Sequence, residues 1–506
     1  MQLLLTAGFI LLIVLWGVLA PESMAAQFDL LLAGITRNFG WLYLWLVLGL
    51  VLMALFLALS RYGNLRLGGD DEQPEFSTAS WFSMLFAAGM GIGLVFWGVA
   101  EPISHFNVAP PPGIKAGTPE AANAAMRHAL FHWGVHPWAV YSIVALAIAF
   151  FMYRRDGRSL ISTVTDALPW RWTKPLGGLF NALAVIATAF GVAASLGMGA
   201  LQINSGLEAV FGVPNTPLAQ VVIIVAATAL FITSAVSGVD RGVRLLSNAN
   251  MILAALLALA VLVLGPTIVI IDTLTNTMGS YLSEFVRMSL RMTPFRDTTW
   301  VGGWTIFYWA WWVSWSPFVG LFIARVSRGR TIREFIVGTV VAPSLAAFLW
   351  FSIFGGTALY MEVWQHVPLS EAVKENVSTA LFQMFDALPG GSLMSAVATL
   401  LVLVFFVTSG DSAVLVLSMM STDGNPHPRA RVKVIWGVLV AGIALSLLLA
   451  GGLKAVQTAT IVFALPFTLV IVLMAWSLWL AIGHDWDEEE RRERELKRKL
   501  RQMMPP

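Results

Sequence analysis

Six tryptophans lie close together in one short stretch of this sequence, and their rings are the first side chains with evident chemistry. They are Trp300, Trp304, Trp309, Trp311, Trp312 and Trp315. On a helix this stretch extends about 22 Å at about 1.5 Å per residue, which is longer than the thin aromatic belt found at a membrane surface. Trp300 and Trp304 fit such a belt. Trp312 and Trp315 require another explanation, because a buried indole N–H needs a partner that leucine would not need.

A second aromatic group occurs at Trp133, Trp138 and Tyr141. At about 100° per residue, the second and third lie about 140° and 80° around a helix from the first, so all three share one side. Two helices thus each offer an aromatic face. Several converging ring faces favour a quaternary ammonium group, which each good contact stabilises by about 0.5–2 kcal/mol.

Three glycines in five residues, Gly89, Gly91 and Gly93, interrupt an otherwise apolar helix. One interpretation is close helix packing, since Gly89 and Gly93 form a GxxxG pair. The other is an unwound helix whose main-chain groups bind a ligand or ion. A second interruption, predicted at the Ser-Trp-Ser-Pro of residues 314–317, favours the unwound helix. Transporters built from inverted repeats place broken helices at corresponding positions in both halves, with the substrate between them.

Three histidines, His128, His132 and His136, recur at helical spacing and share one face. This stripe is the basis for an alternative function of another class, that of a membrane redox or metal protein. Against it, no other histidine is predicted within the membrane, and the scarce carboxylates Glu101 and Asp411 fall near predicted span ends. We expect His132 and His136 to flank the aromatic site instead.

Neighbouring hydroxyls occur in the tenth predicted span, at Thr408 and Ser409. Hydroxyls within spans often bond only to main-chain carbonyls. The alternative is a sodium site, in which these hard oxygen ligands meet carbonyls freed by the unwound third span.

Composition places these residues in a membrane protein. Of the 506 residues 58% are hydrophobic and only 12% are charged, and the formal net charge is +2. The near balance of charges excludes a nucleic-acid binder. The absence of cysteine excludes disulfides, thiolate metal sites and a thiol nucleophile.

A spanning helix needs about 20 mainly apolar residues. Twelve stretches qualify, near 3–20, 40–60, 79–101, 127–153, 176–210, 217–238, 248–271, 300–324, 335–361, 393–420, 434–452 and 455–482. The first is not read as a cleavable signal, because no basic leader precedes it. With this topology 23 of the 31 Lys and Arg lie on one side and 8 on the other, which predicts that both termini are cytoplasmic.

The predicted organisation is all-α, with a pair of five-helix repeats preceded by two extra helices. Its five segments are two N-terminal helices and a cytoplasmic linker at 1–78, a first repeat at 79–271, an amphipathic interfacial helix at 272–299, a second repeat at 300–482, and a charged cytoplasmic tail at 483–506.

Several motifs together resemble the betaine/choline/carnitine transporter family over nearly the whole chain. They are Gly89-Met90-Gly91-Ile92-Gly93 with Glu101-Pro102, His132-Trp133-Gly134, Pro137-Trp138-Ala139-Val140-Tyr141, Gly303-Trp304-Thr305-Ile306-Phe307-Tyr308-Trp309-Ala310-Trp311-Trp312, and Ser316-Pro317-Phe318 through Ile323-Ala324-Arg325. The resemblance implies twelve spans with a five-plus-five inverted repeat of the LeuT type, assembled as a homotrimer in the cytoplasmic membrane.

The resemblance also implies roles for individual residues. Substrate would contact an aromatic box and the glycine segment, comprising Trp133, Trp138, Tyr141, Trp312, Trp315, Phe322, Gly89, Met90, Gly91 and Gly93, with Trp309 and Trp311 on neighbouring segments. Sodium would bind carbonyls of Ala87, Met90 and Phe405 and the hydroxyls of Thr408 and Ser409. A second sodium site would use Thr188 and Phe318, but Val192 stands where sodium-coupled members have a second hydroxyl.

The expected function is therefore import of a quaternary-ammonium zwitterion, glycine betaine or a close analogue, by sodium symport with alternating access. Sodium is the coupling ion, no cofactor is expected, and the protein is not expected to be an enzyme. Members that transport choline with protons often carry Asp at the third glycine, where this chain has Gly93. A proton-coupled choline importer and a transporter of carnitine, dimethylsulfoniopropionate or ectoine remain the alternatives. The tail is short and charge-balanced, unlike the long basic tails of osmosensing members.

Overall fold

The computed structural model describes residues 2–89, 91–111, 113–165, 167–237, 240–295 and 299–503. The regular secondary structure of the described residues is helical, apart from one isolated antiparallel bridge between Arg66 and Thr331. Ten of its helical stretches are long and apolar enough to cross a membrane. Large apolar side chains such as Trp45 and Leu52 are exposed on the outside of the bundle, as a protein surrounded by lipid requires.

Two N-terminal helices lie at the edge of the bundle. They are α1 (Gln2–Leu19) and α2 (Pro21–Leu59), and α2 is much longer than the predicted span at 40–60. Pro21 occupies the first turn of α2, where its missing N–H has no intrahelical partner to lose. The turn Arg61–Asn64 follows.

The glycine run does interrupt the third predicted span. The chain forms α3 (Thr78–Gly89) and α4 (Ile92–Asn107), and Gly91 between them has extended backbone angles of φ −139° and ψ −163°. A new helix starts at Ile92, and α4 continues to Asn107, past the predicted end of the span at 101.

The fourth predicted span is also broken, which the sequence analysis did not anticipate. It consists of α5 (Pro119–Trp133) and α6 (Val135–Tyr153), with Gly134 non-helical between them. Pro137 follows closely and has no N–H to donate to the carbonyl of Trp133, which favours a helix end there. The chain continues through α7 (Ile161–Thr165) and the turn Lys174–Leu176.

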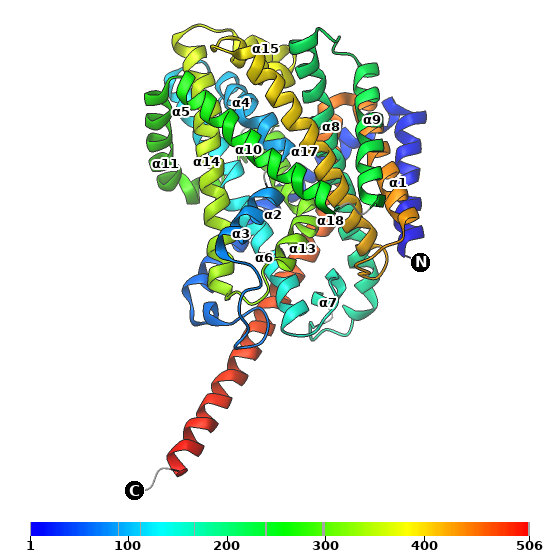
Figure 1. Ribbon diagram of the computed structural model, residues 1–506, viewed down its shortest axis with the longest axis vertical. Coiled ribbons are helices and arrows are strands. Elements are labelled where there is room, and N and C mark those ends of the chain that lie inside the picture. Colours follow the sequence, from blue (N-terminus) through cyan, green and yellow to red (C-terminus); the bar gives the residue numbers. More distant parts are fainter. Residues whose placement is uncertain are drawn as a thin grey trace.

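Long helices form the middle of the chain: α8 (Gly177–Phe211), α9 (Pro217–Ser237), α10 (Asp240–Leu264) and α11 (Thr267–Ser289). Helix α8 ends at Gly212, which adopts a left-handed φ of 68° that glycine accepts without steric cost. Helix α11 covers the first part of the predicted amphipathic segment 272–299, and Ile271 and Leu282 are exposed on it. It packs against α5 and α14 at the left of Figure 1.

The predicted interruption at residues 314–317 is wrong. The tryptophan-rich segment forms α12 (Thr299–Val301), a π-helical turn (Gly302–Ile306) and a single helix α13 (Phe307–Arg325) that continues through Pro317. Pro317 deprives the carbonyl of Val313 of its usual N–H donor, and the hydroxyl of Ser316 donates to that oxygen instead at 2.7 Å. The irregular turn lies at Gly302–Ile306, more than two helical turns earlier.

The remaining elements are α14 (Ile332–Trp364), α15 (Leu369–Glu375), the turn Val377–Thr379, α16 (Ala380–Asp386), α17 (Gly391–Met420) and α18 (Ala430–Met503). Helix α18 is bent at Gly451 and Gly452, and Gly452 has a positive φ of 61°. Its C-terminal part projects away from the bundle in Figure 1. There Arg154 Nε lies 2.9 Å from Asp485 Oδ2, which ties the base of this projection to the end of α6.

Candidate functional site

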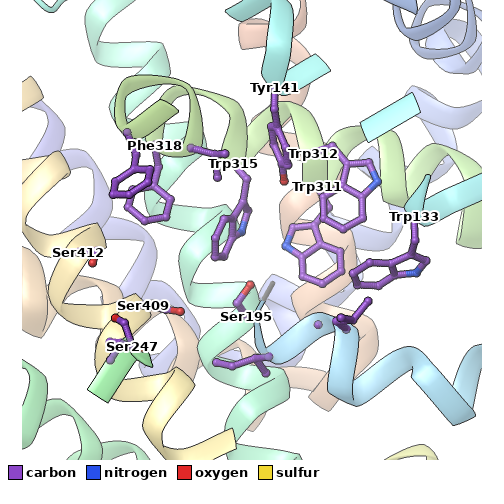
Figure 2. Close-up of a pocket in the computed structure, with 17 residues that line it drawn as sticks. Trp133, Tyr141, Ser195, Ser247, Trp311, Trp312, Trp315, Phe318, Ser409 and Ser412 are labelled. Carbon is purple, nitrogen blue, oxygen red and sulfur yellow. The ribbon is translucent and has the colours of Figure 1, made fainter. Parts of the chain in front are cut away.

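A cavity of about 170 Å³ lies where the broken helix α3–α4 meets α5, α6, α8, α10, α13 and α17. Its lining comprises Gly91, Ile92, Gly93, Leu94, Trp133, Tyr141, Ser195, Ser247, Trp311, Trp312, Trp315, Phe318, Val319, Phe322, Thr408, Ser409 and Ser412. Figure 2 shows Trp133, Tyr141, Trp311 and Trp312 on one side and the hydroxyls of Ser247, Ser409 and Ser412 on the other.

The aromatic side is built from stacked and perpendicular rings. Trp311 and Trp312 stack at 4.8 Å between centroids, with 15° between their planes. Trp133 meets Trp312 edge to face at 5.0 Å, and Tyr141 meets it at 6.1 Å. Rings at such angles present both faces and edges, so a cation in the cavity is reached by the negative face of at least one ring.

Hydrogen bonds to main-chain carbonyls hold two of the cavity indoles, Trp312 and Trp315. The N–H of Trp312 donates to the carbonyl of His132 at 3.0 Å, and the N–H of Trp315 donates to the carbonyl of Gly191 at 2.8 Å. Both acceptors are main-chain atoms of other helices, so each bond fixes the ring against a neighbouring element. The rings are therefore oriented before any ligand enters.

Most residues predicted for the substrate site line this cavity: Gly91, Gly93, Trp133, Tyr141, Trp312, Trp315 and Phe322. Trp138 does not, although it packs edge to face on Tyr141 at 5.6 Å and so supports that ring. Trp309 is buried elsewhere and stacks on His136 at 5.3 Å. Met90 lies outside the described residues, and of Gly89 only the helical backbone of α3 is described.

The predicted sodium ligands are brought together only in part. Thr408 and Ser409 line the cavity, while Phe405 lies one turn earlier on α17 and is buried. The Thr408 hydroxyl donates to the carbonyl of Val404 at 2.9 Å, and its oxygen accepts a long bond from Asn250 Nδ2 at 3.5 Å. Of Ala87 only the backbone is described.

Of the second proposed sodium pair, Phe318 lines the cavity and Thr188 does not. Thr188 is fully buried, and its hydroxyl has no hydrogen-bond partner among the described residues. Val192, one turn further along α8, is buried and supplies no oxygen. The cavity therefore includes only one of the two residues predicted for this pair.

Three cavity hydroxyls were missed by the sequence analysis: Ser195, Ser247 and Ser412. Ser412 lies four residues after Thr408 on α17, so helical spacing alone could have indicated it. Ser195 lies seven residues after Thr188, on the same face of α8. No sequence signal marks Ser247, which reaches the cavity only because α10 packs against α17.

The histidine stripe does not form a three-histidine site. His128 Nδ1 is 2.8 Å from the carbonyl oxygen of Ala124, and His136 Nε2 is 2.8 Å from the hydroxyl of Ser289. Only His132 of the three contacts a carboxylate, with its Nδ1 2.7 Å from Glu101 Oε1.

Two residues of this region lie deeper in the fold than their sequence positions suggested. Glu101 is not near a helix end but inside α4, and its side chain is fully buried. A further histidine, His105, is also fully buried one turn later, with Nε2 3.2 Å from Glu101 Oε1. Both residues belong to α4, which continues to Asn107 and is buried over most of its length. Glu101, His105 and His132 offer ligand atoms within 4.8 Å of one another, a spacing that a metal ion could occupy.

Comparison with known proteins gives matches along nearly the whole chain. A family model for betaine/carnitine/choline family transporters matches residues 2–487. The chain is 47% identical to the glycine betaine transporter OpuD of Bacillus subtilis, over 95% of this chain and 94% of that one. It is 43% identical to an ectoine/hydroxyectoine transporter of Virgibacillus pantothenticus, over 93% of each chain. It is 41% identical to a probable glycine betaine transporter of Desulfitobacterium hafniense, over 96% of this chain and 97% of that one.

Proposed function

This chain belongs to the betaine/carnitine/choline transporter family, and from that premise we propose that it imports a quaternary-ammonium zwitterion, glycine betaine or a close analogue, by sodium symport with alternating access. It is a multi-pass membrane transporter and not an enzyme.

The observation that carries the choice of substrate is the charge of the cavity lining. Five rings of the predicted aromatic box line the cavity, and the ring of Trp311 is a sixth. None of the described residues that line the cavity is Asp, Glu, Lys or Arg. A cationic trimethylammonium group is then stabilised by ring faces rather than by a carboxylate. A substrate that carries its own negative charge suits this lining better than a bare cation.

The start of α4 offers a place for the carboxylate of such a zwitterion. Gly91 and Gly93 line the cavity at the first residues of a helix of 16 residues, where main-chain N–H groups point outward and the helix dipole favours negative charge. A Cβ atom at Gly93 would lie 2.6 Å from Trp311 Cη2 and 2.9 Å from Trp133 Cη2. A side chain at this position therefore competes with the aromatic box for space, and its absence leaves the helix start accessible.

Sodium coupling is supported by the hydroxyls opposite the aromatic rings. Thr408 and Ser409 face the same cavity as the glycine segment, so an ion there would lie beside the break between α3 and α4. Hard oxygen ligands of this kind suit sodium. Ion binding would stabilise the unwound segment and favour substrate binding, and by linkage the substrate would favour the ion equally.

We further propose twelve spans arranged as two five-helix repeats after two extra helices. The ten apolar stretches become twelve when the pair α3–α4 is counted as one broken span and α18 is divided at Gly451 and Gly452. The bias of basic residues supports cytoplasmic termini in a cell membrane. Assembly as a homotrimer is proposed from the family resemblance.

The experiment that tests this function is uptake of labelled glycine betaine into proteoliposomes, with an inward gradient of sodium, of potassium or of protons. Accumulation only with sodium is expected. Accumulation only with protons would refute sodium coupling, and no uptake under any gradient would refute glycine betaine as the substrate.

Ectoine is a second candidate substrate, because a relative 43% identical over 93% of each chain is an ectoine/hydroxyectoine transporter. Competition by unlabelled ectoine, carnitine, choline and dimethylsulfoniopropionate in the same assay ranks these substrates. If ectoine inhibited uptake at lower concentration than glycine betaine itself, ectoine would replace it in the proposal.

A further inference from the structure

Behind the aromatic side of the cavity lies a buried carboxylate that does not reach the cavity itself. Glu101 is fully buried in α4, and side chains from α5 and α13 bond to it. An isolated buried carboxylate is strongly unfavourable, so the groups around it must compensate for the lost water. The described residues provide partners for both of its oxygens.

The first oxygen, Oε2, accepts hydrogen bonds from two aromatic side chains. The indole N–H of Trp133 donates to it at 2.8 Å, and the hydroxyl of Tyr308 also donates to it. Trp133 is itself a wall of the cavity, and an indole nitrogen can only donate. The carboxylate therefore acts directly on the orientation of one ring of the box.

The second oxygen, Oε1, is paired with two histidines, His132 Nδ1 at 2.7 Å and His105 Nε2 at 3.2 Å. With both nitrogens protonated, Glu101 accepts four hydrogen bonds, and the hydroxyl of Thr305 lies 3.1 Å from the remaining nitrogen of His132. His132 is thereby held at both ring nitrogens.

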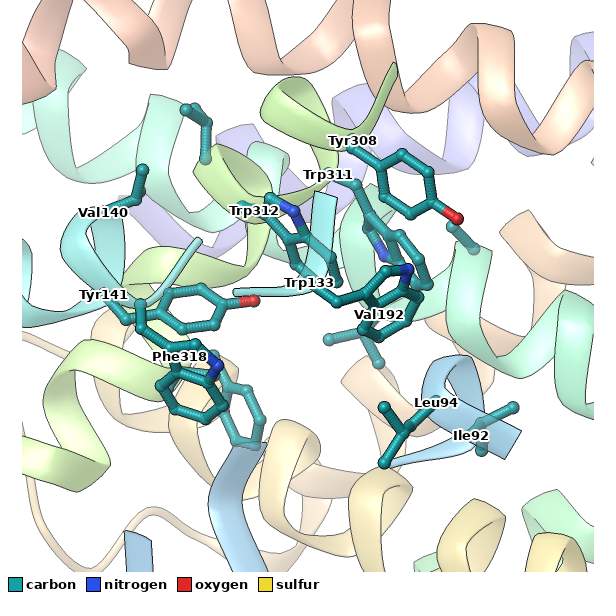
Figure 3. Packing of buried hydrophobic residues seen from close by; sticks show 14 of the residues in the cluster. Ile92, Leu94, Trp133, Val140, Tyr141, Val192, Tyr308, Trp311, Trp312 and Phe318 are labelled. Atoms are coloured by element: carbon teal, nitrogen blue, oxygen red, sulfur yellow. The ribbon is translucent and has the colours of Figure 1, made fainter. Parts of the chain in front are cut away.

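The same histidine links Glu101 to a second ring of the box. The main-chain carbonyl of His132 accepts the indole N–H of Trp312 at 3.0 Å, and the His132 ring stacks on Tyr308 at 4.7 Å. Figure 3 shows Tyr308, Trp311, Trp312 and Trp133 packed together at this place. Trp133 and Trp312 thus depend on one cluster formed by α4, α5 and α13.

We propose that Glu101 is a positioning residue for the substrate site. It fixes Trp133 directly and Trp312 through His132, and it ties the helix that starts at the glycine break to the aromatic box. This inference rests on the proposed function, because it assigns a purpose to a geometry around the same cavity. Side chains held in advance lose less conformational freedom when the ligand binds, which increases affinity.

A double-mutant cycle separates positioning from a general structural role. Glycine betaine binding is measured by tryptophan fluorescence on the purified full chain carrying Glu101→Gln, Trp133→Phe or both. We expect Glu101→Gln to weaken binding about tenfold in the wild-type background and only about threefold when Trp133 is already Phe, because the shared hydrogen bond is then absent and only the path through His132 to Trp312 remains. Equal factors in both backgrounds would overturn the proposal.

Two further variants supply a substitute for Glu101→Gln and a control. Tyr308→Phe removes one hydrogen-bond donor to Glu101 and leaves the carboxylate three partners, so this variant replaces Glu101→Gln if the latter does not fold. We expect Tyr308→Phe to weaken affinity less than Glu101→Gln does, and to weaken it less in the Trp133→Phe background than in the wild type. Trp436→Phe is the matched control, since Trp436 is a fully buried indole that donates to Ser421 Oγ at 2.8 Å away from the cavity. An equal loss of affinity in Trp436→Phe would overturn the proposal.

A readout without substrate keeps this inference distinct from the proposed function. The near-ultraviolet circular dichroism that disappears in Trp133→Phe should also be lost in Glu101→Gln, and retention of that signal would refute positioning whatever the substrate. If the wild-type protein does not bind glycine betaine but the circular dichroism signal is lost in Glu101→Gln, the proposed substrate is wrong and the positioning role stands. Metal analysis of the purified protein covers the remaining possibility, because one equivalent of transition metal would assign Glu101, His105 and His132 to an ion and overturn the hydrogen-bonded cluster.

Discussion

The indole N–H of Trp312 donates to the main-chain carbonyl of His132 at 3.0 Å, which joins the two aromatic segments of the sequence across the cavity wall. The carbonyl belongs to the residue before Trp133, so one bond sets Trp312 in place beside the neighbouring ring of the box. The edge-to-face contact between Trp133 and Trp312 at 5.0 Å follows from this link.

Replacing Trp312 with Leu should weaken glycine betaine affinity about 5–30-fold, because one cation–π contact of about 1–2 kcal/mol is lost. Expression should be retained, since Leu is readily accommodated in a membrane helix. The measurement is the substrate concentration for half-maximal uptake into proteoliposomes. Trp45→Leu is the control, because Trp45 is 58% exposed on the outside of the bundle. Equal affinities for the two variants would remove Trp312 from the substrate site.

Replacing Gly93 with Ala should impair binding at least about tenfold, because the new methyl group would overlap the rings of Trp311 and Trp133 and displace them. Gly178→Ala on α8 is the comparison, since nothing lies within 4 Å of a Cβ atom at that position. Binding can be followed through tryptophan fluorescence, which reports ring displacement as well. Normal affinity in Gly93→Ala would show that the rings are not fixed as described.

The double variant Thr408→Ala, Ser409→Ala should raise the sodium concentration for half-maximal uptake about tenfold or more, because two oxygen ligands are lost. Thr399→Ala provides a matched change on the same helix, since the Thr399 hydroxyl donates to the Ser395 carbonyl at 2.7 Å just as that of Thr408 donates to Val404. Unaltered sodium dependence in the double variant would place the ion elsewhere.

Ser316→Ala should lower the stability of α13 by about 1–3 kcal/mol, because the buried carbonyl of Val313 loses the hydroxyl that substitutes for the missing N–H. The cost should shrink when Pro317 is also replaced by Ala, since residue 317 then supplies its own N–H to that oxygen. Thermal unfolding in detergent of both single variants and the double variant measures these losses of stability. Additive losses would mean that the Ser316 hydroxyl does not compensate for the proline.

The sequence by itself determined the membrane class, the family and most of the aromatic residues that line the cavity. Hydropathy over about 20 residues reports a span directly, helical spacing groups Trp133 with Tyr141, and Thr408 and Ser409 are adjacent in the sequence itself. The glycine run likewise predicted the break before α4, because three glycines in five residues offer little to hold a helix together.

Tertiary structure alone decided which face of each helix meets which neighbour. Spacing placed Trp138 on the same side as Trp133, but the break at Gly134 separates their two helices, and only Trp133 lines the cavity. It also decided how Pro317 is tolerated, because a hydroxyl one residue away can replace the missing donor. Glu101 is the clearest case: a single acidic residue reads as a span end, and its burial becomes favourable only when donors from α5 and α13, over 30 and 200 residues later in the chain, converge on it. Such convergence depends on helix packing, which local sequence does not encode.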